Sequence, residues 1–151
     1  MACTPCRANA EGTAVSNAAE ASVLRGGCLC GAIRYVARGT AYHRTVCHCS
    51  ICRRSAGAPM VAWFSVKLAD FAFTAGQPAS YRSSAKAQRS CCPACGTQLT
   101  FKLDEEDEID VTICSLDDPA AVPPDDHTYV SSQLGWVHLD DGLPRHLQAR
   151  P

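Results

Sequence analysis

The 151-residue sequence lacks several features that define common classes of protein. No apolar run approaches the roughly 18 residues that a membrane-spanning helix needs. Basic residues are not in surplus, because 14 lysines and arginines face 15 aspartates and glutamates, and the formal net charge is −1. The longest basic cluster is the pair Arg53–Arg54, which offers nucleic acid no electrostatic footprint. These absences predict a protein that binds neither a membrane nor nucleic acid.

Residues 1–21 also lack an apolar core between a basic start and a cleavage site, so no secretory signal is expected. We therefore expect a cytoplasmic protein with reduced thiols. The first two dozen residues are rich in Ala, Asn, Ser and Thr and show no periodicity, which predicts a flexible tail over residues 1–24. The remaining chain, residues 25–151, is expected to form one domain that buries roughly two-thirds of its unfolded surface.

Neither a long amphipathic helix nor an internal repeat is present. Short segments of alternating apolar and polar residues, separated by turns, instead predict an all-β domain. The expected strands cover residues 32–38, 60–66, 71–76, 80–84, 98–103 and 108–114, with one more at 127–132. The acidic run 104–108 predicts a solvated hairpin tip. Asp117 or Asp118 is expected to cap a short helical turn over 116–122 that Pro119 opens.

Cysteine, by contrast, is abundant, with eleven residues. The odd count and the absent secretory signal argue against a disulfide framework. The two sulfurs of a C-x-C pair cannot easily bridge each other, but both can face one ion. Because the chain has two such pairs, Cys28/Cys30 and Cys47/Cys49, metal binding is favoured over disulfides.

Seven clustered cysteines divide into a group of four and a group of three. Cys92 and Cys95 form a knuckle, in which a tight turn presents two sulfurs to one ion and Gly96 permits an unusual backbone angle. Cys28 and Cys30 are the natural donors of the other two ligands, which predicts a closed structural site of four thiolates. The alternative is that these cysteines are small buried apolar residues.

Cys47, Cys49 and Cys52 remain as a second site that is one ligand short of four. Catalytic zinc characteristically keeps three protein ligands and an open fourth position. The spacing therefore predicts a vacancy where a substrate binds. Alternatively, a fourth protein ligand closes the site, and the candidates are His43, His48, Cys114 and His127. His48 would otherwise be a surface residue or one that supports a ligand, and Cys114 a core residue.

Four motifs follow one another in the order GGCLCGAIRY, CHCSICRRSAGAP, CPACGTQL and GWVHLDDGLP. This ordered set resembles the family of glutathione-dependent formaldehyde-activating enzymes (GFA) over about residues 25–144. The resemblance implies the β-tent fold of zinc-stapled antiparallel sheets, so that residues 25–151 would be a GFA-like zinc domain. It also implies two zinc ions per chain. By resemblance, the structural zinc ligands are Cys28, Cys30, Cys92 and Cys95, and the catalytic zinc ligands are Cys47, Cys49 and Cys52.

The resemblance further implies a carbon–sulfur lyase or synthase, with glutathione and formaldehyde forming S-hydroxymethylglutathione. Three thiolates on one dication leave a net charge of −1, which makes a bound substrate sulfur more nucleophilic. Arg53 and Arg54 are candidates to receive the carboxylates of a glutathione-like thiol, or they are solvated charges on a turn. The rival functions are a non-enzymatic zinc-binding module that interacts with a protein, and a metal or thiol buffer.

Three cysteines depart from the family pattern. Cys91 stands where family members often carry an aromatic or other bulky apolar residue, and it places another sulfur beside the knuckle. Cys92 and Cys95 keep the proper spacing, so Cys91 is not expected to be a ligand. Cys3 and Cys6 have knuckle spacing but lie in the predicted tail, outside the resemblance. They are either incidental cysteines or a third metal site. No pattern in the sequence predicts an oligomeric state.

Overall fold

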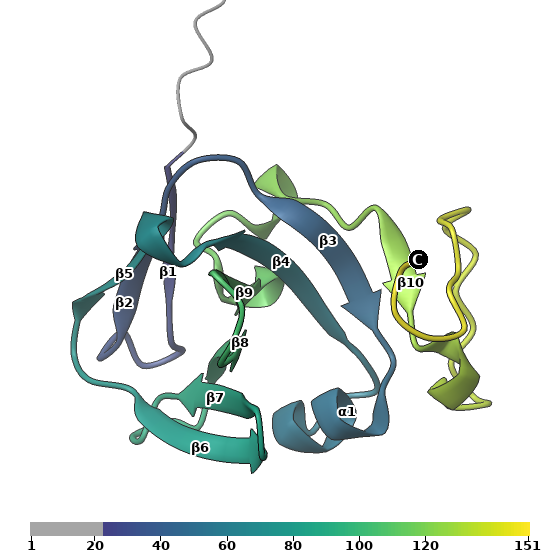
Figure 1. The fold of residues 1–151 in the computed structure, drawn as a ribbon, viewed down its shortest axis with the longest axis horizontal. Coiled ribbons are helices and arrows are strands. Elements are labelled where there is room, and N and C mark those ends of the chain that lie inside the picture. The colour runs from purple at the N-terminus through teal and green to yellow at the C-terminus, as the bar shows by residue number, and fades with distance from the viewer. Residues whose placement is uncertain (1–22) are drawn as a thin grey trace, which may run out of the picture.

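The computed structural model describes residues 23–151, which form two β-sheets (Figure 1). The predicted tail over 1–24, except for its last two residues, and the pair Cys3 and Cys6 lie outside the described residues. Strands dominate the described chain, so the all-β prediction is confirmed. Among residues 23–151, no helix is both long enough and apolar enough to cross a membrane.

The smaller sheet has three antiparallel strands in the order β1-β2-β5. Their bounds are β1 (Leu24–Gly27), β2 (Arg34–Ala37) and β5 (Phe71–Ala75). Gly26 on β1 passes so close to Tyr35 and to the carbonyl of Ser115 that any side chain there would collide with both. A glycine at this position therefore lets the edge strand lie against the buried tyrosine.

The larger sheet has seven strands in the order β10-β3-β4-β9-β8-β7-β6. Their bounds are β3 (Tyr42–Cys47), β4 (Val61–Lys67), β6 (Ala79–Ser84), β7 (Ala87–Cys91), β8 (Gln98–Leu103), β9 (Glu108–Thr112) and β10 (Asp126–Thr128). Every neighbouring pair is antiparallel except β10 and β3, which run parallel. This sheet is therefore antiparallel, as the family resemblance implied, apart from one parallel pair at its edge.

The helical segments of the described chain are short. They are α1 (Ser50–Ala56) and the 3₁₀ turns η1 (Leu68–Asp70), η2 (Ile113–Ser115), η3 (Pro119–Ala121) and η4 (Val130–Ser132). In η3 the Asp118 side chain accepts a hydrogen bond from the Ala120 amide and Pro119 is the first residue, which confirms the predicted turn and its cap. Helix α1 was not predicted, and only the first residues of the strand expected at 127–132 belong to β10.

The main core lies between the small sheet and the central strands of the large sheet. Its largest fully buried members include Tyr35 of β2, Phe64 of β4 and Leu99 of β8. Cys28 and Cys92 belong to the same buried cluster, so one group of cysteines is built into the junction of the two sheets. A separate buried cluster forms around Trp63 and includes two cysteines of the other group.

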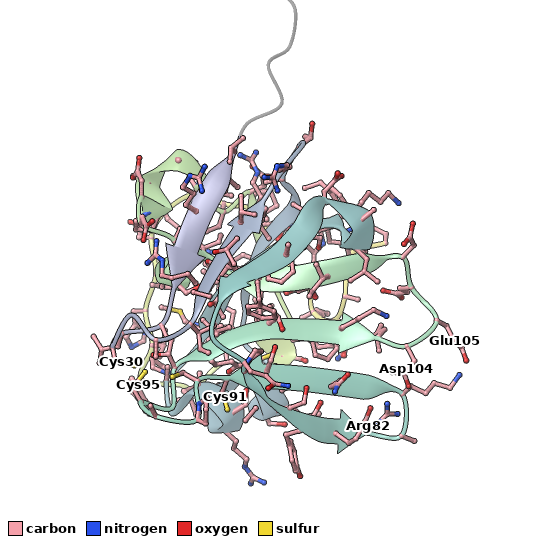
Figure 2. The ribbon with its side chains drawn as sticks, turned by 90° about the vertical axis from the view of Figure 1, so that its left-hand side faces the viewer. Cys30, Arg82, Cys91, Cys95, Asp104 and Glu105 are labelled. Atoms are coloured by element: carbon pink, nitrogen blue, oxygen red, sulfur yellow. The ribbon has the colours of Figure 1, made fainter. Side chains whose placement is uncertain are left out.

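The acidic run forms the exposed tip of the β8–β9 hairpin, as predicted. Arg82 and Lys86 pair there with Asp104 and Glu105 at 2.7 and 3.3 Å. Figure 2 shows this tip at the opposite edge of the molecule from Cys30 and Cys95. The tip is thus remote from the four-cysteine group.

Candidate metal centres and their pocket

The four-cysteine cluster joins two loops that are distant in sequence. Cys28 and Cys30 follow β1, and Cys92 and Cys95 lie between β7 and β8. All four sulfurs lie within 4.8 Å of one another, with Cys28–Cys30 at 3.5 Å and Cys30–Cys92 at 3.7 Å. Zinc–sulfur bonds of about 2.3 Å in a tetrahedron place the sulfurs about 3.8 Å apart. This cluster therefore fits one tetrahedral metal ion.

Local backbone geometry presents these sulfurs. Gly96 adopts a positive φ of 75°, and its amide donates to the carbonyl of Cys92 at 2.9 Å, which closes the knuckle turn. The Ile33 amide donates to Cys28 Sγ at 3.2 Å. A hydrogen bond with the Thr97 hydroxyl, 3.2 Å away, lowers the pKa of Cys95 to about 5. Donors around the sulfurs favour the thiolate form that a metal ion binds.

The three-cysteine cluster is built at the junction of β3 and α1. Cys47 ends β3, Cys49 is the N-cap of α1, and Cys52 lies in its first turn. The three sulfurs also lie within 4.8 Å of one another, and the Cys52 amide donates to Cys49 Sγ at 3.2 Å. The first helical turn and its cap therefore bring together three sulfurs that are five residues apart at most.

The protonation of the three cysteines is linked. Hydrogen bonding with Cys47 and Cys52 lowers the pKa of Cys49 to about 2. Hydrogen bonding with Cys49 raises the pKa of Cys47. The cluster alone thus supports a thiolate at Cys49 beside a protonated Cys47. A bound cation is what allows all three sulfurs to be thiolates together.

None of the four proposed extra ligands joins these three sulfurs in the described part of the chain. His48 is fully buried, so it is not a surface histidine, and its Nε2 lies 3.0 Å from Nδ1 of His127. His127 in turn contacts Asp141 at 2.8 Å. His43 faces Glu108, and Cys114 is exposed rather than in the core. The set of sulfur ligands therefore stays at three.

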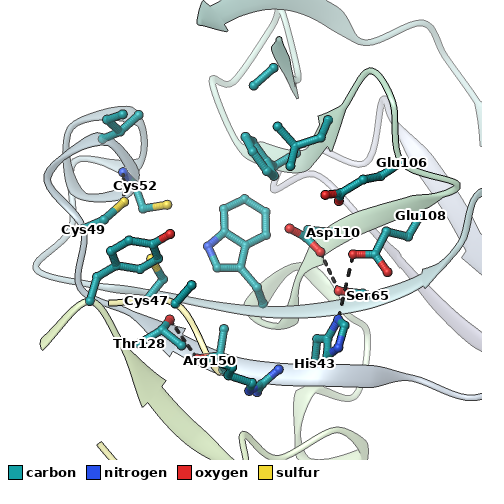
Figure 3. A pocket seen from close by; sticks show the side chains of 18 of the residues that line it. His43, Cys47, Cys49, Cys52, Ser65, Glu106, Glu108, Asp110, Thr128 and Arg150 are labelled. Carbon is teal, nitrogen blue, oxygen red and sulfur yellow. Dashed lines mark hydrogen bonds and ion pairs between the residues drawn. The ribbon is translucent and has the colours of Figure 1, made fainter. Parts of the chain in front are cut away.

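A pocket of about 700 Å³ opens beside the three-cysteine cluster. Trp63 and Phe101 supply apolar wall, and Tyr129 also lines the pocket. At the other end lie the carboxylates of Glu106, Glu108 and Asp110, as Figure 3 shows. Burial raises the pKa of Asp110 to about 6, although the Ser65 hydroxyl donates to it at 2.5 Å. The pocket thus places sulfurs and carboxylates at opposite ends.

Arg89 of β7 is a site residue that the sequence reasoning missed. Its side chain lines the pocket, with Nη2 3.5 Å from Cys52 Sγ and the guanidinium carbon 4.6 Å from the centroid of the Phe101 ring. Cys52 and Arg89 are 37 residues apart. Because only the fold brings them together, no local motif signals this contact.

The two arginines predicted to contact substrate lie elsewhere. Arg53 and Arg54 line a second hollow of about 320 Å³, together with Leu134 and Trp136. Neither lines the pocket that holds the three cysteines. Their role in binding carboxylates stays a prediction. Cys91 ends β7 beside the four-cysteine cluster but is not one of its four members, in line with the expected spacing.

The fold and the two thiol clusters define a β domain that can hold two metal ions. The model of the family described as "Glutathione-dependent formaldehyde-activating enzyme" matches residues 23–132, and the chain belongs to this family. The fourth motif, GWVHLDDGLP, lies beyond the matched residues. The chain is similar to a Rhodobacter sphaeroides protein of known crystal structure. The two sequences are 19% identical, the TM-score between the structures is 0.49, and the alignment covers 81% of this chain and 98% of that one. No curated protein matches the chain.

Proposed function

We propose that the chain is a zinc-dependent carbon–sulfur lyase or synthase that acts on S-hydroxymethylglutathione, the adduct of glutathione and formaldehyde. One observation carries this proposal. In a member of the GFA family, three clustered cysteines with no fourth protein ligand lie in the wall of a pocket of about 700 Å³. A site with three protein ligands leaves a position for a substrate atom, and the pocket gives that substrate room.

We assign a structural zinc to Cys28, Cys30, Cys92 and Cys95, and a catalytic zinc to Cys47, Cys49 and Cys52. Sulfur-only ligand sets favour zinc over hard cations such as magnesium and calcium. When bound at the second site, zinc would lower the pKa of a substrate thiol and polarise an aldehyde oxygen. The four-cysteine set is complete by itself, so we assign it no chemical step.

The reaction is a redox-neutral addition. The glutathione thiol gives its proton to water, and the thiolate attacks the carbonyl carbon of formaldehyde. A carbon–sulfur bond forms while the electron pair of the carbonyl double bond moves to oxygen, which takes a proton back from water. The reverse sequence cleaves the adduct. The wall formed by Trp63 and Phe101 keeps water from one side of the sulfur. Arg53 and Arg54 would contact only a ligand that extends beyond the pocket into the second hollow.

A non-enzymatic module that binds a protein is the second candidate. This alternative predicts an exposed apolar surface near the three-cysteine cluster without a pocket. The pocket favours the enzyme, whereas the exposed side chains of Trp136 and Ile51, at 68% and 53%, favour the module. A metal or thiol buffer would require only a weakly held second ion.

The two candidates predict different results for one measurement. The addition of a thiol to formaldehyde is already fast without a catalyst, so the measurement must detect a rate above this uncatalysed background. We would measure how fast isotopically labelled formaldehyde exchanges between its free and glutathione-bound forms. The enzyme predicts an exchange rate that rises in proportion to protein concentration, and that returns to the uncatalysed rate with the variant C52S. A protein that holds two zinc ions and leaves the exchange rate unchanged would contradict the enzyme and support the module.

A further inference from the structure

Arg89 is held in one place beside the three-cysteine cluster. Its guanidinium carbon lies 4.6 Å from the Phe101 ring centroid and 5.8 Å from that of Trp63. Contacts with two aromatic rings stabilise a cation and limit its movement. Only 8% of the residue is exposed. The positive charge therefore has a fixed location in the pocket wall.

This buried cation lacks a full set of partners. Nη2 contacts Cys52, but Nε and Nη1 have no hydrogen-bond partner among residues 23–151. Four other arginines in this range pair with aspartates, namely Arg34, Arg44, Arg82 and Arg150. Burying a charge with unpaired donors is costly unless a partner arrives. The structure thus maintains, beside the pocket, a cation with two buried donors that no residue of this range pairs.

The other cationic or titratable basic side chains of the pocket wall already have acidic partners. His43 faces Glu108, and Arg150 pairs with Asp126. The far end of the pocket carries the carboxylates of Glu106 and Asp110, which would repel an anion. An anionic group of a ligand is therefore directed to Arg89, next to the sulfurs.

We infer that Arg89 binds a carboxylate of the substrate thiol, which in glutathione is the glycine carboxylate, so that the pocket selects thiols that carry a carboxylate over neutral thiols. This inference rests on the proposed function, which seats the thiol sulfur beside Cys52. Because Arg89 Nη2 is 3.5 Å from Cys52 Sγ, a carboxylate on a short chain reaches the guanidinium directly, and the glycine carboxylate of glutathione reaches it when the thiol folds back on itself. A charge-assisted hydrogen bond with a carboxylate satisfies the unpaired donors. The rival role is that Arg89 only balances the negative charge of the cysteine thiolates.

The test compares 3-mercaptopropionate with its methyl ester, which has the same thiol but no charge. The chain has two tryptophans, so the variant W136F leaves Trp63 as the fluorescence reporter beside Arg89. Binding of each thiol to the zinc-loaded protein is followed by this fluorescence in three proteins: W136F alone, W136F with R89Q, and W136F with R82Q. R82Q is the matched control, because it removes the same charge from an arginine outside the pocket.

We expect the acid to bind about 10- to 100-fold more tightly than the ester in W136F and in the R82Q control. In R89Q this ratio should fall to about one, with two zinc ions retained. Equal weakening of acid and ester in R89Q would overturn the inference, because Arg89 would then act on the sulfur. Loss of the second zinc in R89Q would also overturn it in favour of charge balance.

A competition experiment tests the same inference in the protein that keeps Arg89. Propionate, which has no thiol, should compete with 3-mercaptopropionate but not with the ester, and absence of competition would overturn the inference. If no thiol binds at all, the proposed function fails. Propionate alone must then still change the Trp63 fluorescence in the protein with Arg89 and not in R89Q, or the inference fails as well. Thiol binding without preference for the acid rejects the inference and leaves the proposed function intact.

Discussion

Cys92 and Cys52 carry the same side chain in two different settings. Cys92 is 1% exposed and belongs to the main core between the two sheets, whereas Cys52 lies in the smaller cluster beside the pocket. A metal ion that joins two sheets holds distant parts of the chain together, whereas an ion at the edge of a pocket crosslinks only one short segment and contributes less to the free energy of unfolding. The same substitution is therefore expected to have different consequences at the two positions.

We predict that Cys92→Ser lowers the melting temperature by more than about 10 °C or prevents folding, because several kcal/mol of metal-linked stability are lost. Cys52→Ser should leave a folded domain that keeps one zinc and no longer binds thiols. Thermal denaturation and elemental analysis of the two variants measure this difference. Equal destabilisation by both substitutions would contradict the assignment of a structural and a catalytic site.

Asp110 gives a second prediction at the scale of one residue. Burial raises the pKa of its carboxyl to about 6, whereas the unfolded chain ionises near the ordinary value of 3.8. The folded state therefore holds a proton that the unfolded state has lost between these two pH values, and the contribution of this carboxyl to the free energy of unfolding falls as pH rises from about 4 to about 6. Above that range the ionised carboxylate lowers the free energy of unfolding by its full amount, on the order of 1–3 kcal/mol.

Asp110→Asn removes this ionisation and keeps an oxygen that accepts from the Ser65 hydroxyl. We expect the variant to be more stable than the wild type at pH 7 and equal to it near pH 4. Urea denaturation across this pH range measures the effect. Asp107→Asn, at the exposed hairpin tip, is the matched control. A difference in stability between Asp110→Asn and the wild type that does not grow from about pH 4 to about pH 6 would contradict the prediction.

At the scale of elements, the C-terminal segment supports the end of β3 that carries Cys47. Strand β10 pairs in parallel with β3, and the His48 amide donates to the Thr128 carbonyl at 3.0 Å. The amide of His127 donates to Pro144, and that of His146 donates to His127, both at 2.8 Å. The contacts from Asp141 through His127 to His48 extend this support to the residue between Cys47 and Cys49.

We predict that His127→Gln loosens the three-cysteine site without releasing the other ion. The substitution removes the ring that orients His48, so a chromogenic chelator should remove one zinc several-fold faster, while the second zinc leaves at the wild-type rate. His138→Gln is the matched control, because His138 is exposed in the same C-terminal segment. Unchanged release kinetics would show that the histidine pair does not support the site.

The elements that could be predicted differ physically from those that could not. The sequences of β8 and β9 both alternate between apolar and polar residues, and in β9 the apolar residues Ile109 and Val111 are buried. Strand β7 hides this pattern, since Arg89 and Ser90 are polar yet buried. Strand β3 is interrupted by His43, whose φ of 48° accompanies a shift in register. The seven residues of α1 are too few to show a helical period, and parallel pairing of β10 with β3 depends on contacts distant in sequence.

The candidate site shows the same division. The groups of four and three cysteines could be predicted because spacing within each pair limits which sulfurs can face one ion, and the structure brings the same sets together. Arg53 and Arg54 were chosen because they follow Cys52 directly, yet successive residues of a helix point in different directions. Arg89 could not be predicted, since its contact with Cys52 exists only after β7 and α1 have taken their places.

For the whole molecule, the two sites differ in what they hold together. The four-cysteine cluster connects the loop after β1 of the small sheet to the β7–β8 loop of the large sheet, and Figure 2 shows Cys30 and Cys95 side by side there. The three-cysteine cluster lies within one short stretch and connects only β3 to α1. Loss of the ion at the four-cysteine cluster should therefore separate the sheets, whereas loss of the ion at the three-cysteine cluster should not.

We predict two zinc ions per chain that leave in two steps as chelator is added. The first step should remove one ion, abolish thiol binding and leave the β-sheet circular dichroism unchanged. The second should remove the remaining ion together with loss of the sheet signal, because metal binding there contributes directly to folding. Elemental analysis and circular dichroism on the same samples follow both steps. A coloured protein that contains iron would contradict the choice of metal, and unfolding that accompanies the first ion would contradict the assignment of structural and catalytic sites.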